Sequence, residues 1–215
     1  MRKDGADFAR FRALISVPCE TEQRLRIYVD LLSRWQTTTN LISIATLESV
    51  WTRHVADSAQ LFDFVPDKFR WVDMGSGAGF PGMVIAIRLA KTSEAIVHCI
   101  ESDRRKCAFL REVARETDAA VQVHAARIED VCFSDTGRID ALTARGFAPL
   151  VETLQTGRKW LNEGATGVFP RGNFAAGDVD ALRAILTSRI ELKQSIVDSA
   201  STVVVVRPNA FGKLS

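Results

Sequence analysis

The sequence has few of the residues that build disulfide frameworks and zinc sites. Its four cysteines and three histidines are scattered through 215 residues, and no two cysteines form a C-x-x-C pair. This spacing predicts neither a structural zinc ion nor a set of disulfides. We therefore expect no metal ligands, and thiols that are buried or inert.

Long apolar runs are also missing. The run from Val203 to Val206 is far too short to cross a bilayer, and Arg10 and Arg12 interrupt the N-terminus where a signal peptide needs an unbroken apolar stretch. We therefore expect a cytoplasmic protein with no membrane partner. The net charge is only +2, so a nucleic-acid partner would require a concentrated basic patch, or a folded RNA or ribonucleoprotein as substrate.

What the chain does have is a glycine-rich stretch, Arg70 to Gly82. An apolar strand with one acid, Asp73, is followed by three alternate glycines and by Pro81, which suits the first turn of a helix. The glycines are Gly75, Gly77 and Gly79. A strand, a glycine loop and a helix N-terminus together are the usual nucleotide-binding site of an α/β sheet.

The spacing favours S-adenosylmethionine (SAM) as the ligand. From Gly77, the loop also satisfies the dinucleotide pattern G-x-G-x-x-G, which alone is a weak signal. From the strand end it is acid-x-Gly-x-Gly-x-Gly, and the Asp73 carboxylate suits the ammonium group of SAM but not a pyrophosphate. Glu101, ending the next strand, is expected to accept both ribose hydroxyls, as it would for NAD. A dinucleotide, or a tight turn without a ligand, remains an alternative.

The hydrophobic pattern changes near residue 70. Before it, amphipathic helices are expected at 4–17, 21–35 and 47–64, and residues 1–69 form a predicted N-terminal helical extension. After it, strands and helices alternate, which indicates a parallel sheet over residues 70–215. Expected strands are 70–74, 95–100, 121–124, 139–144, 164–169, 189–197 and 202–207, and expected helices are 81–91, 103–117, 147–161 and 176–187.

The last two expected strands lie too close in sequence for a parallel crossover, so they should pair antiparallel. A Rossmann-like, doubly wound sheet that ends in an antiparallel hairpin is the outline of the class I SAM-dependent methyltransferase fold. We therefore predict an α/β protein of that class with an N-terminal helical extension.

Candidate cofactor contacts also follow the third strand. Ile128 and Glu129 stand where such folds bind adenine through a backbone amide and an acid, although Glu129 and Asp130 could instead cap a short helix. Phe80 and Phe147 could stack on the adenine or on a flipped base, or each could belong to the core.

The end of the fourth strand, Thr143 to Phe147, lacks several catalytic groups. It has no Asn or Asp followed by Pro-Pro and an aromatic for amine methylation, no cysteine nucleophile for cytosine carbon 5, and no Lys or His base for oxygen methylation. Guanine N7 requires none of these because its lone pair is free. Catalysis would then reduce to proximity and orientation. Arg145 would touch cofactor or guanine, or form an ion pair with an acid of the sheet edge.

Three further groups have simpler interpretations. Arg171, after the fifth strand, offers a phosphate contact or is an exposed loop charge. The run Arg104-Arg105-Lys106 is interpreted as a solvated helix face. His54 and Ser58 lie one turn apart beside an apolar stripe, where a core histidine is the simpler interpretation.

These residues together resemble the RsmG (GidB) family, whose members methylate guanine N7 in a loop of 16S rRNA. The resemblance runs from about Trp35 to Arg207. Its motifs are Asn40-Leu41, Arg53-His54-x-x-Asp57-Ser58, Asp73-x-Gly75-x-Gly77-x-Gly79-Phe80-Pro81-Gly82, Glu101-Ser102, Arg127-x-Glu129 and Ala144-Arg145. The glycine loop is common to many methyltransferases, but its combination with the motifs before and after it is specific.

The resemblance implies an rRNA (guanine-N7-)-methyltransferase that uses SAM and acts on 16S rRNA or the small ribosomal subunit, at guanosine 527 in the 530 loop. No obligate protein partner is evident. The implied SAM contacts are Gly75, Phe80, Ile128, Glu129 and Arg145. Asn40, Arg53 and His54 are implied on the RNA-facing side. Arg171 stands where the family usually has lysine, so no lysine-specific role is transferred to it.

Three other functions fit parts of the sequence. A methyltransferase for a protein or a small molecule would use the same cofactor site. A NAD-linked oxidoreductase fits the glycines and Glu101, but the only tyrosine, Tyr28, lies in a leading helix, which leaves no place for a tyrosine-lysine proton relay. A non-catalytic nucleotide-binding regulator would explain the missing base, as N7 chemistry also does.

Overall fold

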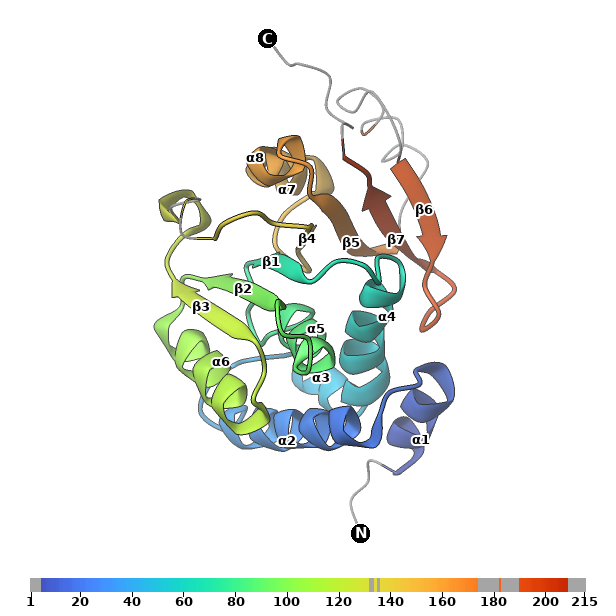
Figure 1. Cartoon of the computed structure of the whole chain (residues 1–215). Helices are drawn as coiled ribbons and strands as arrows, with labels where there is room; N and C mark the ends of the chain where they lie inside the picture. Colours follow the sequence, from blue (N-terminus) through green and yellow to red (C-terminus); the bar gives the residue numbers. More distant parts are fainter. Residues whose placement is uncertain (1–4, 132–133, 135, 174–181, 183–189, 209–215) are drawn as a thin grey trace.

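A computed structural model describes residues 5–131, 134, 136–173, 182 and 190–208 of the chain (Figure 1). Its sheet has seven strands in the order β3-β2-β1-β4-β5-β7-β6. The strands are β1 (Arg70–Met74), β2 (Ile96–Glu101), β3 (Val121–Ala125), β4 (Ala141–Thr143), β5 (Thr166–Asn173), β6 (Ile190–Gln194) and β7 (Ser201–Val206).

Strands β1 to β5 pair in parallel, whereas β7 pairs antiparallel with both β5 and β6. The expected C-terminal hairpin is therefore confirmed, and its second strand, β7, is the one inserted beside β5. The four consecutive valines Val203–Val206 of β7 are buried because β7 lies inside the sheet and both of its faces are covered.

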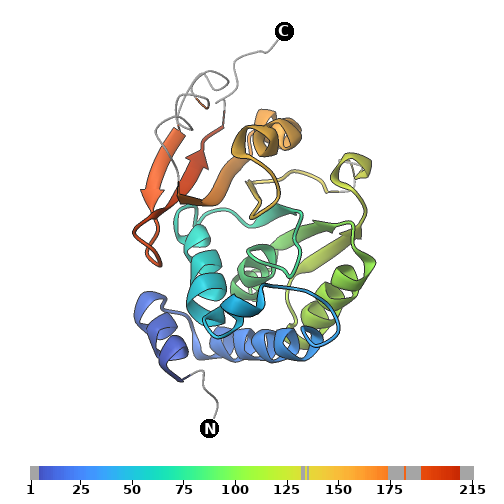
Figure 2. The same ribbon diagram turned by 180° about the vertical axis from the view of Figure 1, so that it is seen from behind.

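Helices cover both faces of the sheet (Figures 1 and 2). One face carries α2 (Cys19–Trp35), α5 (Gly82–Leu89) and α6 (Arg104–Thr117), and the other carries α7 (Leu150–Thr156) and α8 (Arg158–Asn162). Each face has its own cluster of buried apolar side chains. No helix among the described residues has the length and apolar character that crossing a membrane requires. The expected helix at 176–187 lies outside the described residues, apart from residue 182.

The expected helix at 47–64 is confirmed over residues 50–63 but not at its start, where α3 (Ile44–Leu47) is a separate short helix. The first part of the long helix is a π-helical segment, η1 (Trp51–Ala56), which continues directly into α4 (Asp57–Asp63). The start of η1 is held from outside, because the Asp7 carboxylate on α1 (Gly5–Leu14) accepts hydrogen bonds from the Trp51 backbone N–H and the Thr52 hydroxyl, at 2.8 and 2.5 Å. The hydrophobic period does not show such a long-range contact.

The expected helix at 147–161 is also two helices, α7 and α8, joined at Gly157. A Cβ on Gly157 would lie 2.3 Å from Leu142 Cδ2, so only glycine lets the junction approach strand β4 this closely. The apolar period continues through Gly157, which explains why the sequence suggests one helix.

The N-terminal helices share a core with the sheet. The hydroxyl of Tyr28 on α2 donates to the carbonyl oxygen of Ala78 in the glycine loop at 2.5 Å, and the Trp35 indole N–H donates to Glu112 on α6 at 3.1 Å. Phe11 of α1 and Leu32 of α2 are fully buried in the same apolar cluster. Helix α2 therefore supports the loop from behind. The division of the chain near residue 70 remains a prediction.

Candidate functional site

The glycine loop leaves β1 at the carboxyl edge of the sheet in a conformation that glycine adopts readily. Gly75, Gly77 and Gly79 have φ values of +66°, +56° and +93°. The Ser76 backbone N–H donates to the carbonyl oxygen of Ile100 on the next strand at 3.0 Å. The loop is thereby held across two strand ends, and it forms one side of a cavity of about 550 Å³.

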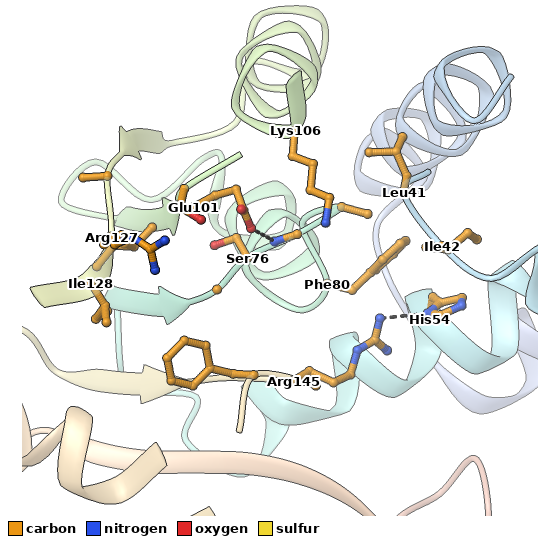
Figure 3. Close-up of a pocket in the computed structure, with 18 of the residues that line it drawn as sticks. Leu41, Ile42, His54, Ser76, Phe80, Glu101, Lys106, Arg127, Ile128 and Arg145 are labelled. Carbon is orange, nitrogen blue, oxygen red and sulfur yellow. Dashed lines mark hydrogen bonds between the residues drawn. The ribbon is translucent and has the colours of Figure 1, made fainter. Parts of the chain in front are cut away.

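This first cavity is built from segments that are far apart in the sequence, including η1, which contributes His54 (Figure 3). Glycine-loop residues and Phe80 meet the ends of β2, β3 and β4, and a loop after α2 faces them from the N-terminal helices. The residues expected at the site from the sequence that line it are Gly75, Gly77, Phe80, Glu101, Ile128, Glu129, His54, Arg145 and Phe147, whereas Gly79 is not in its lining. Its volume lies in the range of small-molecule sites.

Glu101 lies on the cavity wall with both carboxylate oxygens engaged. Oε2 accepts the Gly77 backbone N–H and Oε1 accepts the Asp103 backbone N–H, each at 2.8 Å. A carboxylate has about four acceptor positions, so each oxygen keeps capacity for one hydroxyl. Both the loop and the start of α6 therefore hold Glu101 in place, which is the arrangement that binding a ribose would need.

The structure does not bring Asp73 to this wall. Its side chain is fully buried, and Oδ2 accepts the Gly82 backbone N–H at 3.1 Å beneath the start of α5. Alternation along β1 points Asp73 toward the α5 face, whereas the cavity lies beyond the strand end. The expectation that this carboxylate meets an ammonium group at the cavity is corrected accordingly. Burial raises the pKa of Asp73 to about 7, against the opposing hydrogen bonds from Ser76 and Gly82.

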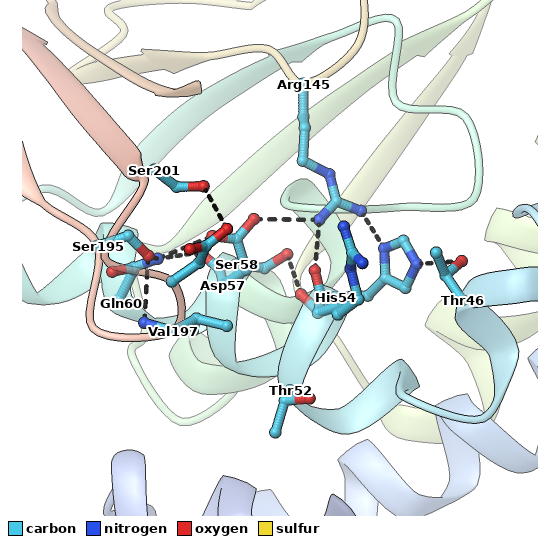
Figure 4. A network of polar contacts seen from close by, with 12 residues as sticks. Thr46, Thr52, His54, Asp57, Ser58, Gln60, Arg145, Ser195, Val197 and Ser201 are labelled. Carbon is cyan, nitrogen blue, oxygen red and sulfur yellow. Dashed lines mark hydrogen bonds and ion pairs between the residues drawn. The ribbon is translucent and has the colours of Figure 1, made fainter. Parts of the chain in front are cut away.

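Arg145, at the end of β4, joins the sheet to the N-terminal helices (Figure 4). Its guanidinium donates to His54 Nδ1 at 2.7 Å, to the Asp57 carboxylate at 3.3 Å and to the backbone oxygen of Arg53 at 3.3 Å. It also lies 5.1 Å from the centre of the Phe80 ring. The expected ion pair exists, but its partner is on α4 and not at the sheet edge.

His54 is held on both sides of its ring. Nε2 lies 2.9 Å from the Thr46 hydroxyl, and Nδ1 receives the Arg145 N–H. Burial, together with the positive charges of Arg145 and Arg53, lowers the pKa of His54 to about 3. His54 is therefore a neutral imidazole that accepts from Arg145, in place of the simple core histidine that the helix pattern suggests.

A second cavity, of about 520 Å³, lies on the other side of this contact. It shares Thr46, His54 and Arg145 with the first cavity, so these three residues form the wall between the two. The remaining lining comes from α1, η1, α4, β5 and the β6–β7 hairpin, and its charged members are Arg10, Arg53, Asp57, Arg171 and Asp198.

Arg171 is half-buried in the second cavity and is not a loose loop charge. Its guanidinium donates to the Ala148 carbonyl oxygen at 2.9 Å and to the Thr153 hydroxyl at 3.1 Å. Asn40, by contrast, is exposed and lines neither cavity; it borders a shallow hollow beside Ile44 and Lys106. The structure thus brings Arg53, His54 and Arg171 together and leaves Asn40 apart.

Sequence reasoning missed two groups of cavity residues. Arg104 and Arg105 are exposed as expected, but Lys106 is half-buried and lines the first cavity. Lys106 lies in the first turn of α6, the helix that follows Glu101, and this position in the sequence could have indicated that it lies near the cavity. Leu41 and Thr46 also line the first cavity, and they reach it only because the N-terminal segment folds over the sheet edge.

The cysteines and histidines of the described residues form no group of three that could hold a metal ion. Cys99 and Cys107 are buried free thiols, and Cys19 is exposed. Burial raises the pKa of the Cys99 thiol. Cys132 lies outside the described residues.

A doubly wound sheet with an antiparallel β7 beside β5, and a glycine loop at the end of β1, defines the class I SAM-dependent methyltransferase fold. Two solved structures share this fold. A branched-chain polyamine synthase from Thermus thermophilus has a TM-score of 0.59 and 13% identity, with 87% of this chain and 65% of that chain covered. TrmK from M. capricolum has a TM-score of 0.51 and 10% identity, with 81% and 73% covered.

Sequence comparison is more specific. Residues 21–204 match the family model GidB, described as rRNA small subunit methyltransferase G, and the chain belongs to that family. A ribosomal RNA small subunit methyltransferase G from Methylorubrum populi is 45% identical over 191 residues, which cover 89% of this chain and 90% of the relative. The protein of that name from Methylobacterium nodulans is 41% identical over 201 residues, covering 93% and 94%.

Proposed function

We propose that this protein transfers a methyl group from SAM to N7 of a guanosine in the 16S rRNA of the small ribosomal subunit. The observation that carries the proposal is membership of the rRNA small subunit methyltransferase G family across residues 21–204. The individual nucleotide, guanosine 527, comes from the family resemblance described above.

The first cavity fits SAM by its chemistry. Glu101 offers oxygen acceptors for the ribose hydroxyls, while Ile128 and Phe147 offer apolar surface for the adenine, with Glu129 beside them. The glycine loop allows a ligand to lie against the backbone. When bound, SAM supplies a methyl group on a positively charged sulfur. Arg145, Gly146 and Phe147 at the end of β4 are then the residues that face the acceptor.

The wall residues supply no proton acceptor, and N7 methylation needs none. The lone pair of N7 forms the new bond to the methyl carbon as the carbon–sulfur bond breaks, so the positive charge passes from sulfur to the methylated base and no proton moves. His54 stands beside this position, but both of its nitrogens are hydrogen bonded and its pKa is about 3. It is therefore a poor base, and its part is to orient Arg145.

Three candidate RNA-binding residues, Arg53, His54 and Arg171, line the second cavity together with Arg145, which supports a role for this cavity in RNA binding. Contacts between guanidinium groups and phosphates fix the position of the RNA, but they do not read its base sequence. Asn40 lies farther along the same N-terminal segment, beside the first cavity, where it could contact RNA at the rim.

The test is to incubate the purified protein and SAM with small subunits, and separately with naked 16S rRNA, from a strain that lacks the enzyme. N7-methylguanosine is then located by chemical cleavage and reverse transcription. We expect one new cleavage site, and none with Arg145→Ala. SAM binding by calorimetry without any new site, on either substrate, would disprove the proposed reaction.

A further inference from the structure

The second cavity has a carboxylate and a guanidinium side by side in its wall. Asp57 Oδ2 lies 3.3 Å from Arg145 Nη1, and the two side chains are 19% and 21% exposed. Arg145 borders both cavities, whereas Asp57 borders only the second. Moving outward from the first cavity, a ligand would therefore meet first the hydrogen-bond donors of Arg145 and then the acceptor oxygens of Asp57.

The Asp57 carboxylate is held in this orientation from behind (Figure 4). The buried Gln60 side chain donates to Asp57 Oδ1 at 2.9 Å and to the Ser195 hydroxyl at 3.0 Å, and its oxygen accepts the Ile196 backbone N–H at 3.0 Å. The hairpin between β6 and β7 thus supports an acid on α4. Among the described residues, each Asp57 oxygen has one hydrogen-bond partner, which leaves acceptor capacity toward the cavity.

Guanine presents the complementary order along its edge. Starting from N7, the next group is the O6 acceptor, followed by the N1–H donor and the 2-amino donor. A base whose O6 accepts from Arg145 and whose N1–H and 2-amino group donate to Asp57 would point N7 back toward the first cavity. No other common base has this order, because adenine has a donor in place of O6 and a bare acceptor at N1.

We infer that the second cavity is the binding site of a flipped-out guanosine and that Asp57, together with Arg145, determines the specificity for guanine. This inference rests on the proposed function. Enzymes that modify a base commonly extrude it into a pocket and bind its Watson–Crick edge by hydrogen bonds. Asp57 is thus a specificity residue on the substrate side, separate from the SAM contacts.

The rim of the cavity suits the phosphates of the same nucleotide. Arg10 and Arg53 are exposed there, and the Arg10 guanidinium makes only a long contact of 3.4 Å to the Val197 oxygen among the described residues. The cavity therefore has Asp57 at its inner wall for the base. At its mouth, exposed guanidinium groups are available for the RNA backbone, beside one exposed carboxylate, Asp198, that accepts hydrogen bonds from Ala200 and Ser201.

The experiment compares small subunits reconstituted on 16S rRNA with guanosine or inosine at the methylated position, because inosine lacks only the 2-amino group. A hydrogen bond to a charged group is worth roughly 10-fold or more, so we expect wild-type kcat/KM to fall at least about 10-fold with inosine. With Asp57→Asn, we expect guanosine activity to fall by a similar factor and the guanosine-to-inosine ratio to approach one, with unchanged SAM affinity by calorimetry.

A matched control is Asp63→Asn on the same helix, which removes a carboxylate paired with Arg88 at 2.8 Å, away from both cavities. It should keep the wild-type guanosine-to-inosine ratio. If Asp57→Asn also keeps that ratio while wild-type protein methylates the subunits, the inference is wrong and the proposed function stands. If wild-type protein methylates neither substrate, the proposed function itself has failed.

Discussion

The two cavities on either side of the His54–Arg145 contact are built in different ways. The first rests on backbone: three glycines with positive φ, strand ends, and the N–H groups that hold Glu101. The second is made of side chains that come from α1, η1, α4, β5 and the β6–β7 hairpin. A site made by backbone geometry suits a ligand that never varies, whereas a site made by side chains can be specific for one base in one RNA.

The largest effect is expected from breaking the backbone of the first cavity with Gly79→Ala. At a φ of +93°, the new Cβ would lie 2.8 Å from Met83 Cβ and 2.9 Å from Leu110 Cδ2. Strain and overlap together should cost about 3 kcal/mol of unfolding free energy and abolish measurable SAM binding. Urea unfolding and calorimetry measure both quantities.

Gly164→Ala is the matched control for that substitution. Its φ is +104°, yet nothing lies within 4 Å of its added Cβ, so only strain of about 1 kcal/mol should appear. If the two variants lose the same amount of unfolding free energy, the close packing of Gly79 against Met83 and Leu110 does not contribute to the effect of Gly79→Ala.

The next largest effect should come from the wall that both cavities share. Arg145→Lys keeps the charge but cannot donate at once to His54, Asp57 and the Arg53 oxygen. We expect kcat/KM for the small subunit to fall about 100-fold, equivalent to about 2.7 kcal/mol. Glu101→Gln should instead weaken SAM binding and leave RNA affinity unchanged. If lysine restores full activity, a point charge is sufficient and the fork geometry is unimportant.

Opposite pH dependences should distinguish the carboxyl buried beneath the glycine loop, Asp73, from His54 in the wall between the cavities. The native pKa of Asp73, about 7, is above its ordinary 3.8, so its stabilisation is complete below pH 3.8 and is lost as pH rises toward 7. The native pKa of His54, about 3, is below its ordinary 6.5, so its stabilisation is complete above pH 6.5 and is lost as pH falls toward 3. Each slope is at most about 1.4 kcal/mol per pH unit.

Unfolding in urea between pH 4.5 and 6.5 measures these slopes. Relative to wild type, Asp73→Asn should make stability rise more steeply with pH, and His54→Asn should make it rise less. Slopes that both variants leave unaltered would show that neither group titrates differently in the folded and unfolded chain.

A smaller effect should follow from loosening the support behind the glycine loop. Tyr28→Phe removes the hydroxyl that donates to Ala78 and should cost about 1 to 2 kcal/mol, with SAM affinity a few-fold weaker. The control is Thr117→Val, which removes a buried hydroxyl that donates to the Val113 oxygen at 2.7 Å within α6. It should lower stability without changing SAM affinity. A Tyr28→Phe protein with wild-type SAM affinity would show that α2 does not position the loop.

The smallest effect is expected at the mouth of the second cavity. Arg53→Gln should weaken RNA binding a few-fold at low salt and reduce the slope of log affinity against log salt by about 1. Arg105→Gln, on the exposed face of α6, should leave that slope unchanged. Filter binding across a salt series makes the comparison, and equal slopes for the two variants would remove Arg53 from the RNA interface.

The sequence by itself determined most of the sheet and the first cavity. Gly75, Gly77 and Gly79 are contiguous with their strand and helix. Glu101 ends the buried strand β2, and Ile128 comes shortly after the edge strand β3. A local pattern predicts such residues because the carboxyl ends of parallel strands meet at one edge. The same pattern suggested Asp73 as a ligand contact, since a spacing in the sequence does not say toward which face a strand side chain points.

Only the tertiary structure determined which residues come together to line the second cavity. Its residues come from Arg10 to Ser201, and no spacing in the chain relates Asp57 to Arg145, or Gln60 to Ser195. These pairs meet because the N-terminal helices bury their apolar faces against α5 and the sheet, which brings their polar groups to the sheet edge. Hydrophobic burial is not directional. The periodicity of the helices therefore predicts that they pack, whereas the packed structure decides which charged groups face one another.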